Sequence, residues 1–352
     1  MVSLTAVKAS NELLATTLLN LVAIFVGGTS GIGEYSLKSF AKHTRQPRVY
    51  FIGRSQEAGD RIKAECQKLN PGGEFIFMKS DTSLIRNVDA VCNEIKKKEK
   101  SINILFMTTG TLSPTGKSVL LEDGLGYVLI FAAKTEEGLM TALSLAHYSR
   151  IRFTLNLLSL IQSAPALRRV VSVFCGTKEG PIDVNDLDYR HGPTFPPLAA
   201  RGHASSLVTF GLEGLARQAP DVSFIHGFPG AVKSNIARDL KGFPYLMITG
   251  VYKVVGRWVY IPEEEVGERH LFLATSSKYA SLKVEADGLE LLNSVQVARG
   301  TDGNVGSGVY SIQQNCESAV PEVEKLLAGF RKEGIVEKVW AHTEAEFKRI
   351  TG

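Results

Sequence analysis

The sequence has few cysteines, and none is spaced as a metal site or a disulfide framework requires. Cys66, Cys92, Cys175 and Cys316 lie far apart along the 352 residues. Structural zinc sites and small disulfide-rich domains use closely spaced cysteine pairs. The sequence therefore predicts no metal centre and no secreted disulfide scaffold. It favours a reducing compartment, which we take to be the cytoplasm.

Long uninterrupted apolar runs are also missing. The stretch Leu13–Val26 lacks a basic n-region, contains Asn20 and runs into a glycine turn, so it predicts a buried helix followed by a strand rather than a signal anchor. Leu246–Ile261 is interrupted by two basic residues and is too short to cross a bilayer. We expect a mobile substrate lid at residues 244–262, with shallow membrane contact as the alternative, and no stable membrane insertion.

Basic clusters of the kind that bind nucleic acid are absent. The net charge of +4 comes from scattered lysines and arginines. The longest basic run, Lys96–Lys98 with Lys100, closes a predicted helix, where cations suit the C-terminal dipole, and no aromatic residues interleave with it. We expect no nucleic-acid partner. The content of 44% hydrophobic and 22% charged residues is typical of a globular enzyme.

What the sequence does contain is a regular alternation of short β-branched runs and helical stretches, the pattern of a parallel sheet wrapped by helices. Helices are expected to begin near Ile32, Gln56, Leu84, Glu136 and Ser205. The first six predicted strands fit one doubly wound sheet with helices on both faces, which binds ligands at the carboxyl ends of its strands. The predicted strands are Val22–Val26, Val49–Ile52, Glu74–Met78, Ile102–Met107, Val170–Phe174, Ser223–His226 and Val309–Ile312.

These elements predict a single domain over residues 1–320. Residues 321–352 are expected to form a C-terminal extension of amphipathic helices that pack on the sheet or on a partner subunit. One segment breaks the alternation, because residues 117–133 are apolar but follow neither a strand nor a helix period. This segment is an extra hairpin, a substrate-gating insert or the translation of an unspliced intron; the cDNA sequence distinguishes the last from the others.

The strongest local signal is the glycine-rich turn Val26-Gly-Gly-Thr-Ser-Gly-Ile-Gly33. Gly27 allows a tight turn off the first strand, Gly31 lets the backbone approach a pyrophosphate, and Gly33 lets the following helix lie against the sheet. The turn lies between a β-branched strand and a helix, which is the context that such a phosphate site needs. We therefore predict a Rossmann-type dinucleotide site that also includes Thr29, Ser30 and Ile32.

The ends of the second and third strands indicate which dinucleotide binds. An acidic residue at Gly53 would grip the 2′-hydroxyl of NAD, but a glycine stands there and Arg54 follows, whose guanidinium suits a 2′-phosphate. NADP(H) is therefore the predicted cofactor. Asp81 is placed to accept a hydrogen bond from the adenine amino group, and a role as helix N-cap is compatible with that.

These residues resemble the short-chain dehydrogenase/reductase family over about Val22–Asn235, and the chain looks most like members from fungal secondary-metabolite gene clusters. The resemblance also rests on Thr109 and Gly110 after the fourth strand, on Glu137–Leu139 and on Tyr148–Arg150. Residues Phe228–Gly230 match as well. In the family, that last segment closes over the nicotinamide, which implies that Pro229 and Gly230, with Ser234 as the following hydroxyl residue, bind cofactor. Family members are commonly homo-oligomers, so the resemblance implies one here.

The usual catalytic groups of the family have no counterparts here. Its reductases use a serine, a tyrosine, a lysine four residues beyond the tyrosine, and a helix asparagine; the lysine lowers the pKa of the phenol so that it exchanges protons near neutral pH. Cys175 stands at the serine position, Arg201 at the tyrosine position, Ser205 at the lysine position and Ala146 at the asparagine position. No tyrosine lies between Pro193 and Pro220, so a shift of register does not restore the usual set.

Three residues are candidates to replace the missing groups. Tyr148 lies on the helix that lines family active sites, with a core aromatic role as the alternative. His203 lies near the expected start of the catalytic helix and is a candidate acid, with a capping or surface role as the alternative. Cys175 either takes part in chemistry or fills a serine-sized space.

Three functions follow from these observations. The first is an NADP(H)-dependent oxidoreductase that reduces a carbonyl or enone of a small hydrophobic substrate such as a polyketide or terpenoid intermediate, with the proton from water, Tyr148 or His203. The second is a redox-neutral isomerase, cyclase or dehydratase on the same scaffold. The third is a non-catalytic nucleotide-binding protein. Consumption of NADPH, product without consumption, and binding without product distinguish them.

Overall fold

The computed structural model describes residues 1–111, 133–191, 197–233, 260–284, 287–292 and 295–352. Most of the segment expected to be irregular, 117–133, and most of the expected lid, 244–262, lie outside the described residues, and so does Ser234. No helix in the described part of the chain is both long enough and apolar enough to cross a bilayer.

A parallel sheet of seven strands forms the centre of the molecule, in the order β3-β2-β1-β4-β5-β6-β7. This confirms the predicted doubly wound α/β fold, and the strand order reverses between β1 and β4, where such sheets bind ligands. The strand at residues 309–312 adds a seventh member to the predicted six. The strands are β1 Val22–Val26, β2 Arg48–Gly53, β3 Glu74–Lys79, β4 Ile104–Met107, β5 Arg169–Val173, β6 Ser223–Gly227 and β7 Val309–Ile312.

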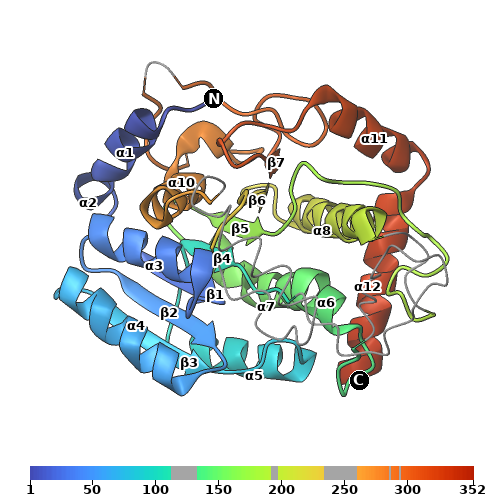
Figure 1. Cartoon of the computed structure of the whole chain (residues 1–352), viewed down its shortest axis with the longest axis horizontal. Helices are drawn as coiled ribbons and strands as arrows, with labels where there is room; N and C mark the ends of the chain where they lie inside the picture. The colour runs from blue at the N-terminus through green and yellow to red at the C-terminus, as the bar shows by residue number, and fades with distance from the viewer. Residues whose placement is uncertain (112–132, 192–196, 234–259, 285–286, 293–294) are drawn as a thin grey trace.

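Both faces of the sheet are buried because alternate residues of each strand point to opposite sides. In β1, Ile24 and Val26 join one apolar cluster, while Ala23 and Phe25 join the other. The first cluster lies under α5 (Ile85–Lys96), α7 (Ser149–Gln162) and α8 (Pro197–Gln218). The second lies under α3 (Gly31–His43), α4 (Gln56–Leu69), α10 (Glu263–Thr275) and α1 (Leu4–Glu12). Figure 1 shows these helices on either side of the strands.

Two helix starts differ from the predictions. The helix expected near Glu136 begins instead at α6 (Thr141–Leu143), followed by the π-helical turn η1 (Ser144–Tyr148) and α7. The delay arises because residues 134–140 form a turn in which Gly138 has φ +82° and in which the Glu137 carboxylate accepts the Ile85 amide proton at 2.6 Å. Helix α8 begins at Pro197, eight residues before the predicted Ser205, because proline suits a first helical position.

The remaining helical elements lie before β1, after α10 and at the C-terminal end of the described chain. The helix and strand predicted over residues 13–26 are α2 (Leu14–Thr17) and β1. The prediction that this helix is buried is wrong, because only Leu14 of α2 is buried. A 3₁₀ turn, η3 (Ser277–Tyr279), follows α10. The expected C-terminal helices are α11 (Pro321–Lys332) and α12 (Ile335–Thr351). Helix α12 packs on α8 and α5 of the same chain, and its Val339 and Phe347 belong to the cluster beneath those helices. The prediction that these helices pack on the sheet is therefore wrong, because α12 lies on the helical layer that covers it. The domain boundary at residue 320 stays a prediction.

Candidate cofactor and substrate site

The glycine turn after β1 brings backbone against backbone. Gly27 has φ +90° and Gly31 has φ +55°, conformations that side chains disfavour. A Cβ added at Gly33 would lie 2.2 Å from the Gly27 carbonyl oxygen, so only glycine lets α3 start this close to β1. Ser30, the N-cap residue, makes no side-chain capping bond. The first amides of α3 therefore face the cleft described next, where the helix dipole favours an anion.

A cleft of about 750 Å³ lies at the carboxyl ends of β1, β2 and β4. We call it the cofactor cleft. It brings together most of the residues predicted to bind cofactor; Gly33 lies behind them, where it packs the helix. Those that line it are Gly27, Thr29, Ser30, Gly31, Ile32, Arg54, Asp81, Thr109 and Gly110.

The end of β2 has no room for a side chain. A Cβ at Gly53 would lie 2.5 Å from Thr29 Oγ1, so the acidic residue of an NAD site does not fit beside Thr29 in this arrangement. Arg54, the next residue, is exposed at the rim of the cleft. The end of β2 therefore carries no carboxylate at residue 53 and has the Arg54 guanidinium beside the cleft, as the sequence predicted.

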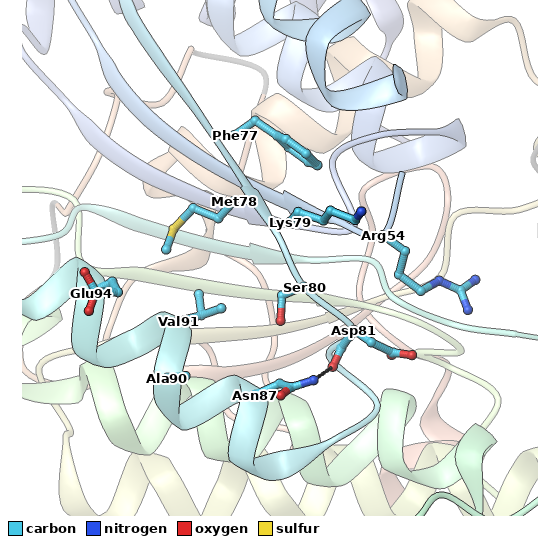
Figure 2. Close-up of a pocket in the computed structure, with 10 residues that line it drawn as sticks. All are labelled: Arg54, Phe77, Met78, Lys79, Ser80, Asp81, Asn87, Ala90, Val91 and Glu94. Carbon is cyan, nitrogen blue, oxygen red and sulfur yellow. Dashed lines mark hydrogen bonds between the residues drawn. The ribbon is translucent and has the colours of Figure 1, made fainter. Parts of the chain in front are cut away.

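A second cavity, of about 790 Å³, continues from the cofactor cleft between β3 and α5 and shares Arg54, Ser80 and Asp81 with it. We call it the outer pocket; Figure 2 shows Asp81, Arg54 and Ser80 among the residues that line it. Asp81 Oδ1 accepts the Ser83 amide proton at 3.0 Å, and its carbonyl accepts a hydrogen bond from Asn87 Nδ2, also at 3.0 Å. Asp81 therefore holds the turn before α5. The predicted N-cap role is wrong, because the N-cap of α5 is Leu84 and the helix has no side-chain capping bond; the contact of Asp81 with an adenine stays a prediction.

Several cleft residues were missed by sequence reasoning. Thr108 donates to the carbonyls of Val26 and Gly27, both at 3.3 Å, and so closes the glycine turn from β4. The Tyr35 hydroxyl donates to the Lys233 carbonyl at 3.2 Å, which ties the loop after β6 to α3. No motif marks these positions; Thr108 alone had a signal, because it precedes Thr109 at the end of a predicted strand.

A carboxylate also lines the cleft. Glu34 accepts a bidentate hydrogen bond from Arg61, with both distances 2.9 Å, and a further bond from Lys38 at 2.6 Å. Burial raises the pKa of Glu34, but the hydrogen bonds from Arg61 and Lys38 outweigh burial and lower it overall. The two cations therefore offset the negative charge that would otherwise oppose a bound phosphate.

The loop after β6 begins with Phe228, Pro229 and Gly230. Pro229 and Gly230 are not among the residues that line the cofactor cleft, whereas Lys233, three residues further on, is. Gly230 has φ +74°, which turns the chain back toward the cleft. The predicted contacts of Pro229, Gly230 and Ser234 with a nicotinamide stay predictions.

Arg150 forms the floor between β4 and β5. Its side chain is fully buried and donates to the carbonyls of Thr109 at 2.6 Å and Val173 at 3.0 Å, and to Ser172 Oγ at 2.7 Å. Burial lowers the pKa of Arg150 to about 9, so the group remains a cation at neutral pH. It holds the ends of the two strands together beside the cleft residue Thr109.

Two of the positions matched to the family's catalytic groups, Cys175 and Ser205, lie in contact. Ser205 Oγ donates to the Cys175 carbonyl at 2.5 Å, which joins α8 to the loop after β5. Burial raises the pKa of the Cys175 thiol to about 11, although the nearby charges of Arg201 and Arg150 act to lower it. The thiol is therefore protonated at neutral pH, and Cys175 is not among the residues that line the cofactor cleft.

Tyr148 and His203 lie in the core. The Tyr148 hydroxyl lies 2.8 Å from His342 Nε2 on α12, and burial raises the pKa of the phenol well above its usual value. His203 Nδ1 accepts the Asp183 amide proton at 3.1 Å, and Nε2 donates to the Leu187 carbonyl at 3.1 Å. Both side chains are buried, and neither lines the cofactor cleft. Their catalytic roles stay predictions.

The comparisons with known proteins agree with this geometry. A family model described as short chain dehydrogenase matches residues 21–123. The chain is 39% identical to oxidoreductase AN1596 of Emericella nidulans over 98% of each chain. It is 29% identical to the short-chain dehydrogenase/reductase SAT2 of Stachybotrys chartarum over 92% of this chain and 91% of that one. Among solved structures, L-sorbose reductase from Gluconobacter frateurii shares the fold, with a TM-score of 0.52, 14% identity, and coverage of 74% of this chain and 92% of that one.

Proposed function

Because the chain belongs to the short-chain dehydrogenase/reductase family, we propose that it is an NADP(H)-dependent oxidoreductase that reduces a carbonyl or enone of a small hydrophobic molecule. One observation carries the proposal: the cofactor cleft joins the amides at the start of α3 to Arg54 at the end of β2.

The residues of the cleft fit a nicotinamide dinucleotide phosphate. A diphosphate suits the backbone of Gly27–Gly31, where three of the five residues are glycines and the segment leads into the first turn of α3. Arg54 suits the 2′-phosphate, since a guanidinium binds phosphate through paired hydrogen bonds. The similar L-sorbose reductase was solved with NADPH and L-sorbose, which supports the same choice of cofactor here.

When bound, the cofactor supplies a hydride to the substrate carbon. The chain's own part is to orient the two reactants. Thr109 and Gly110 follow β4 and line the cleft, and Arg150 holds the Thr109 carbonyl in place. The proton that the substrate oxygen then takes comes from water in our proposal, because the protons of Tyr148 and His203 are used in internal hydrogen bonds.

The substrate class follows from the resemblance to fungal secondary-metabolite enzymes and from relatives such as SAT2, a fungal protein. We propose that the substrate is a polyketide or terpenoid intermediate. We also propose a cytoplasmic location and a homo-oligomeric state.

One observation favours a second candidate function. Arg201 takes the position at which the family has its proton-donating tyrosine, and a guanidinium does not give up a proton near neutral pH. A redox-neutral isomerase, cyclase or dehydratase does not reduce a carbonyl, so it does not need the proton donor that completes that reduction. In that case the nucleotide would be retained to shape the site.

The test is to mix the purified protein with NADPH and polyketide or terpenoid ketones and to follow both the absorbance of reduced nicotinamide and the products. We expect NADPH oxidation in step with product. Product without NADPH oxidation would replace the oxidoreductase by the redox-neutral enzyme. Nucleotide binding with no product from any ketone would leave the non-catalytic binding protein as the better description.

A further inference from the structure

Two exposed cations gather where β5 meets α8. Arg201 lies one turn before Ser205 on α8, so both residues share a face of the helix, and Ser205 bonds the Cys175 carbonyl. Arg201 therefore lies on the face that meets the loop after β5. In that loop, Lys178 Nζ lies 5.1 Å from the centre of the Phe228 ring. Both cations are exposed to solvent.

The acid nearest in sequence points away from these cations. Glu179 is buried and accepts hydrogen bonds from Thr209 at 2.8 Å and from Ser311 at 2.7 Å. Its carboxylate also lies 3.6 Å from His226 Nδ1. Among the described residues, no carboxylate forms an ion pair with Arg201 or Lys178, so their charges add to that of Arg150 beneath the loop.

This cationic group lies beside the inner end of the cofactor cleft. Met107 of β4 pairs with Ser172 of β5, so the segments that follow, Thr109–Gly110 and Phe174–Cys175, leave the same edge of the sheet side by side. Arg150 bonds both segments' strands at Thr109 and Val173. A substrate next to Gly110 would thus meet the loop that carries Lys178 and the face of α8 that carries Arg201.

We propose that the substrate carries an oxyanion, as a carboxylate, enolate or phenolate, and that Arg201 and Lys178 bind it. This inference rests on the proposed function, because it concerns the substrate of the same site. An arginine remains charged at neutral pH and presents paired donors to two oxygens. Where the family has a proton donor, this chain has an anion-binding group, and Arg201 becomes a determinant of substrate specificity.

Two probes of the same shape test the charge requirement: 2-naphthoate and its neutral counterpart 2-naphthamide, titrated by calorimetry into protein saturated with NADP⁺. We expect the wild type to bind 2-naphthoate at least about 10-fold more tightly than 2-naphthamide, which is the range of a charge-assisted hydrogen bond. Arg201→Gln should remove this preference and leave the affinity for naphthamide within about twofold, and Arg201→Lys should keep part of it.

Arg217→Gln is the matched control, because Arg217 is on the same helix but pairs with Glu337 of α12. It should leave both affinities unchanged. Equal binding of the two probes by the wild type, no binding of naphthoate, or equal losses for both probes in Arg201→Gln would overturn the inference. A separate NADP⁺ titration tests the cofactor; if that fails, the probes are titrated without nucleotide, so the two failures remain distinguishable.

Discussion

Gly53 has no side chain, and this determines which groups the cofactor cleft can present at the end of β2. Because a Cβ there would lie 2.5 Å from Thr29 Oγ1, a carboxylate for the 2′-hydroxyl of NAD would need Thr29 to move. The next residue, Arg54, stands at the rim. In our proposal, this pair of neighbouring residues determines the choice between the two coenzymes.

Arg54→Asp should weaken NADPH binding by about 10- to 100-fold, because paired hydrogen bonds to a phosphate are replaced by repulsion. NADH, which lacks that phosphate, should lose little. Equilibrium titration of both coenzymes measures the effect. Arg45→Asp is the matched control: Arg45 is also exposed but lies before β2, at the opposite edge of the sheet. Equal losses for NADPH and NADH would contradict the assignment of Arg54.

At the scale of single residues, the sequence predicted the features that depend on the local backbone. The glycine turn and Arg54 stand beside strand ends, so their place follows from the chain order. Arg61 and Lys233 enter the same cleft through the packing of α3 against α4 and through a loop returning after β6. No spacing in the sequence carries that information.

Among the elements, α7 and the turn before it determine where Tyr148 points. Leu145 of η1 lines the cofactor cleft, but Tyr148, three residues later, is turned into the core, where its ring meets Phe347 edge-on with centroids 6.4 Å apart. Its hydroxyl bonds His342 of α12. The residue thus fastens the C-terminal helix to the layer beside the sheet.

Tyr148→Phe should lower the free energy of unfolding by about 1–3 kcal/mol, because His342 loses a buried partner, and should leave kcat and KM for NADPH-dependent turnover near those of the wild type. Urea unfolding and steady-state kinetics measure the two effects. Tyr310→Phe is the matched control, because it also removes a buried tyrosine hydroxyl, in this case one that donates to a backbone carbonyl. A large fall in kcat with unchanged stability would instead show that the Tyr148 phenol takes part in the reaction.

Helix starts were predicted best where the cap is local. Helix α4 begins at the expected Gln56, with Ser55 Oγ accepting the Ala58 amide proton. Helix α8 was predicted to begin too late, at Ser205, and the turns before Ser205 include Gly202, a poor residue for a helix interior. The structure explains this glycine: a Cβ at Gly202 would lie 2.9 Å from the Gly180 Cα. That close contact is tertiary, and a local pattern does not contain it.

The molecule as a whole buries histidines that are neutral when folded. Burial lowers the pKa of His147 to about 3 and that of His270 to about 4. In the unfolded chain a histidine titrates near pH 6.5, so as pH falls below that value the unfolded state takes up protons first. The stability that these residues contribute is complete above about pH 6.5 and is lost as pH falls toward their folded pKa values.

The free energy of unfolding should therefore fall between pH 6.5 and pH 4, with a slope of up to ~1.4 kcal/mol per pH unit for each buried histidine. His270→Gln should make this slope shallower by about one proton, measured by urea unfolding between pH 7 and pH 5. His191→Gln, at an exposed position, should leave the slope unchanged. An identical slope in wild type and His270→Gln would contradict the burial argument.

The sheet was predictable because its strands are apolar on both faces and alternate regularly with helices. Helices α1 and α10 were not predicted. Helix α1 packs on α10, and α10 packs on α3. Asn11 of α1 is bonded to the buried Glu268 of α10, so polar residues belong to this contact. A pattern that looks for apolar stripes misses such an interface.

Calorimetry of the wild-type protein with NADPH is the most direct measurement of whether the cofactor cleft holds a dinucleotide. Saturable one-to-one heat is expected, with NADH binding more weakly. A folded protein that gives no heat with either NADPH, NADP⁺ or NADH would contradict the assignment of the glycine turn.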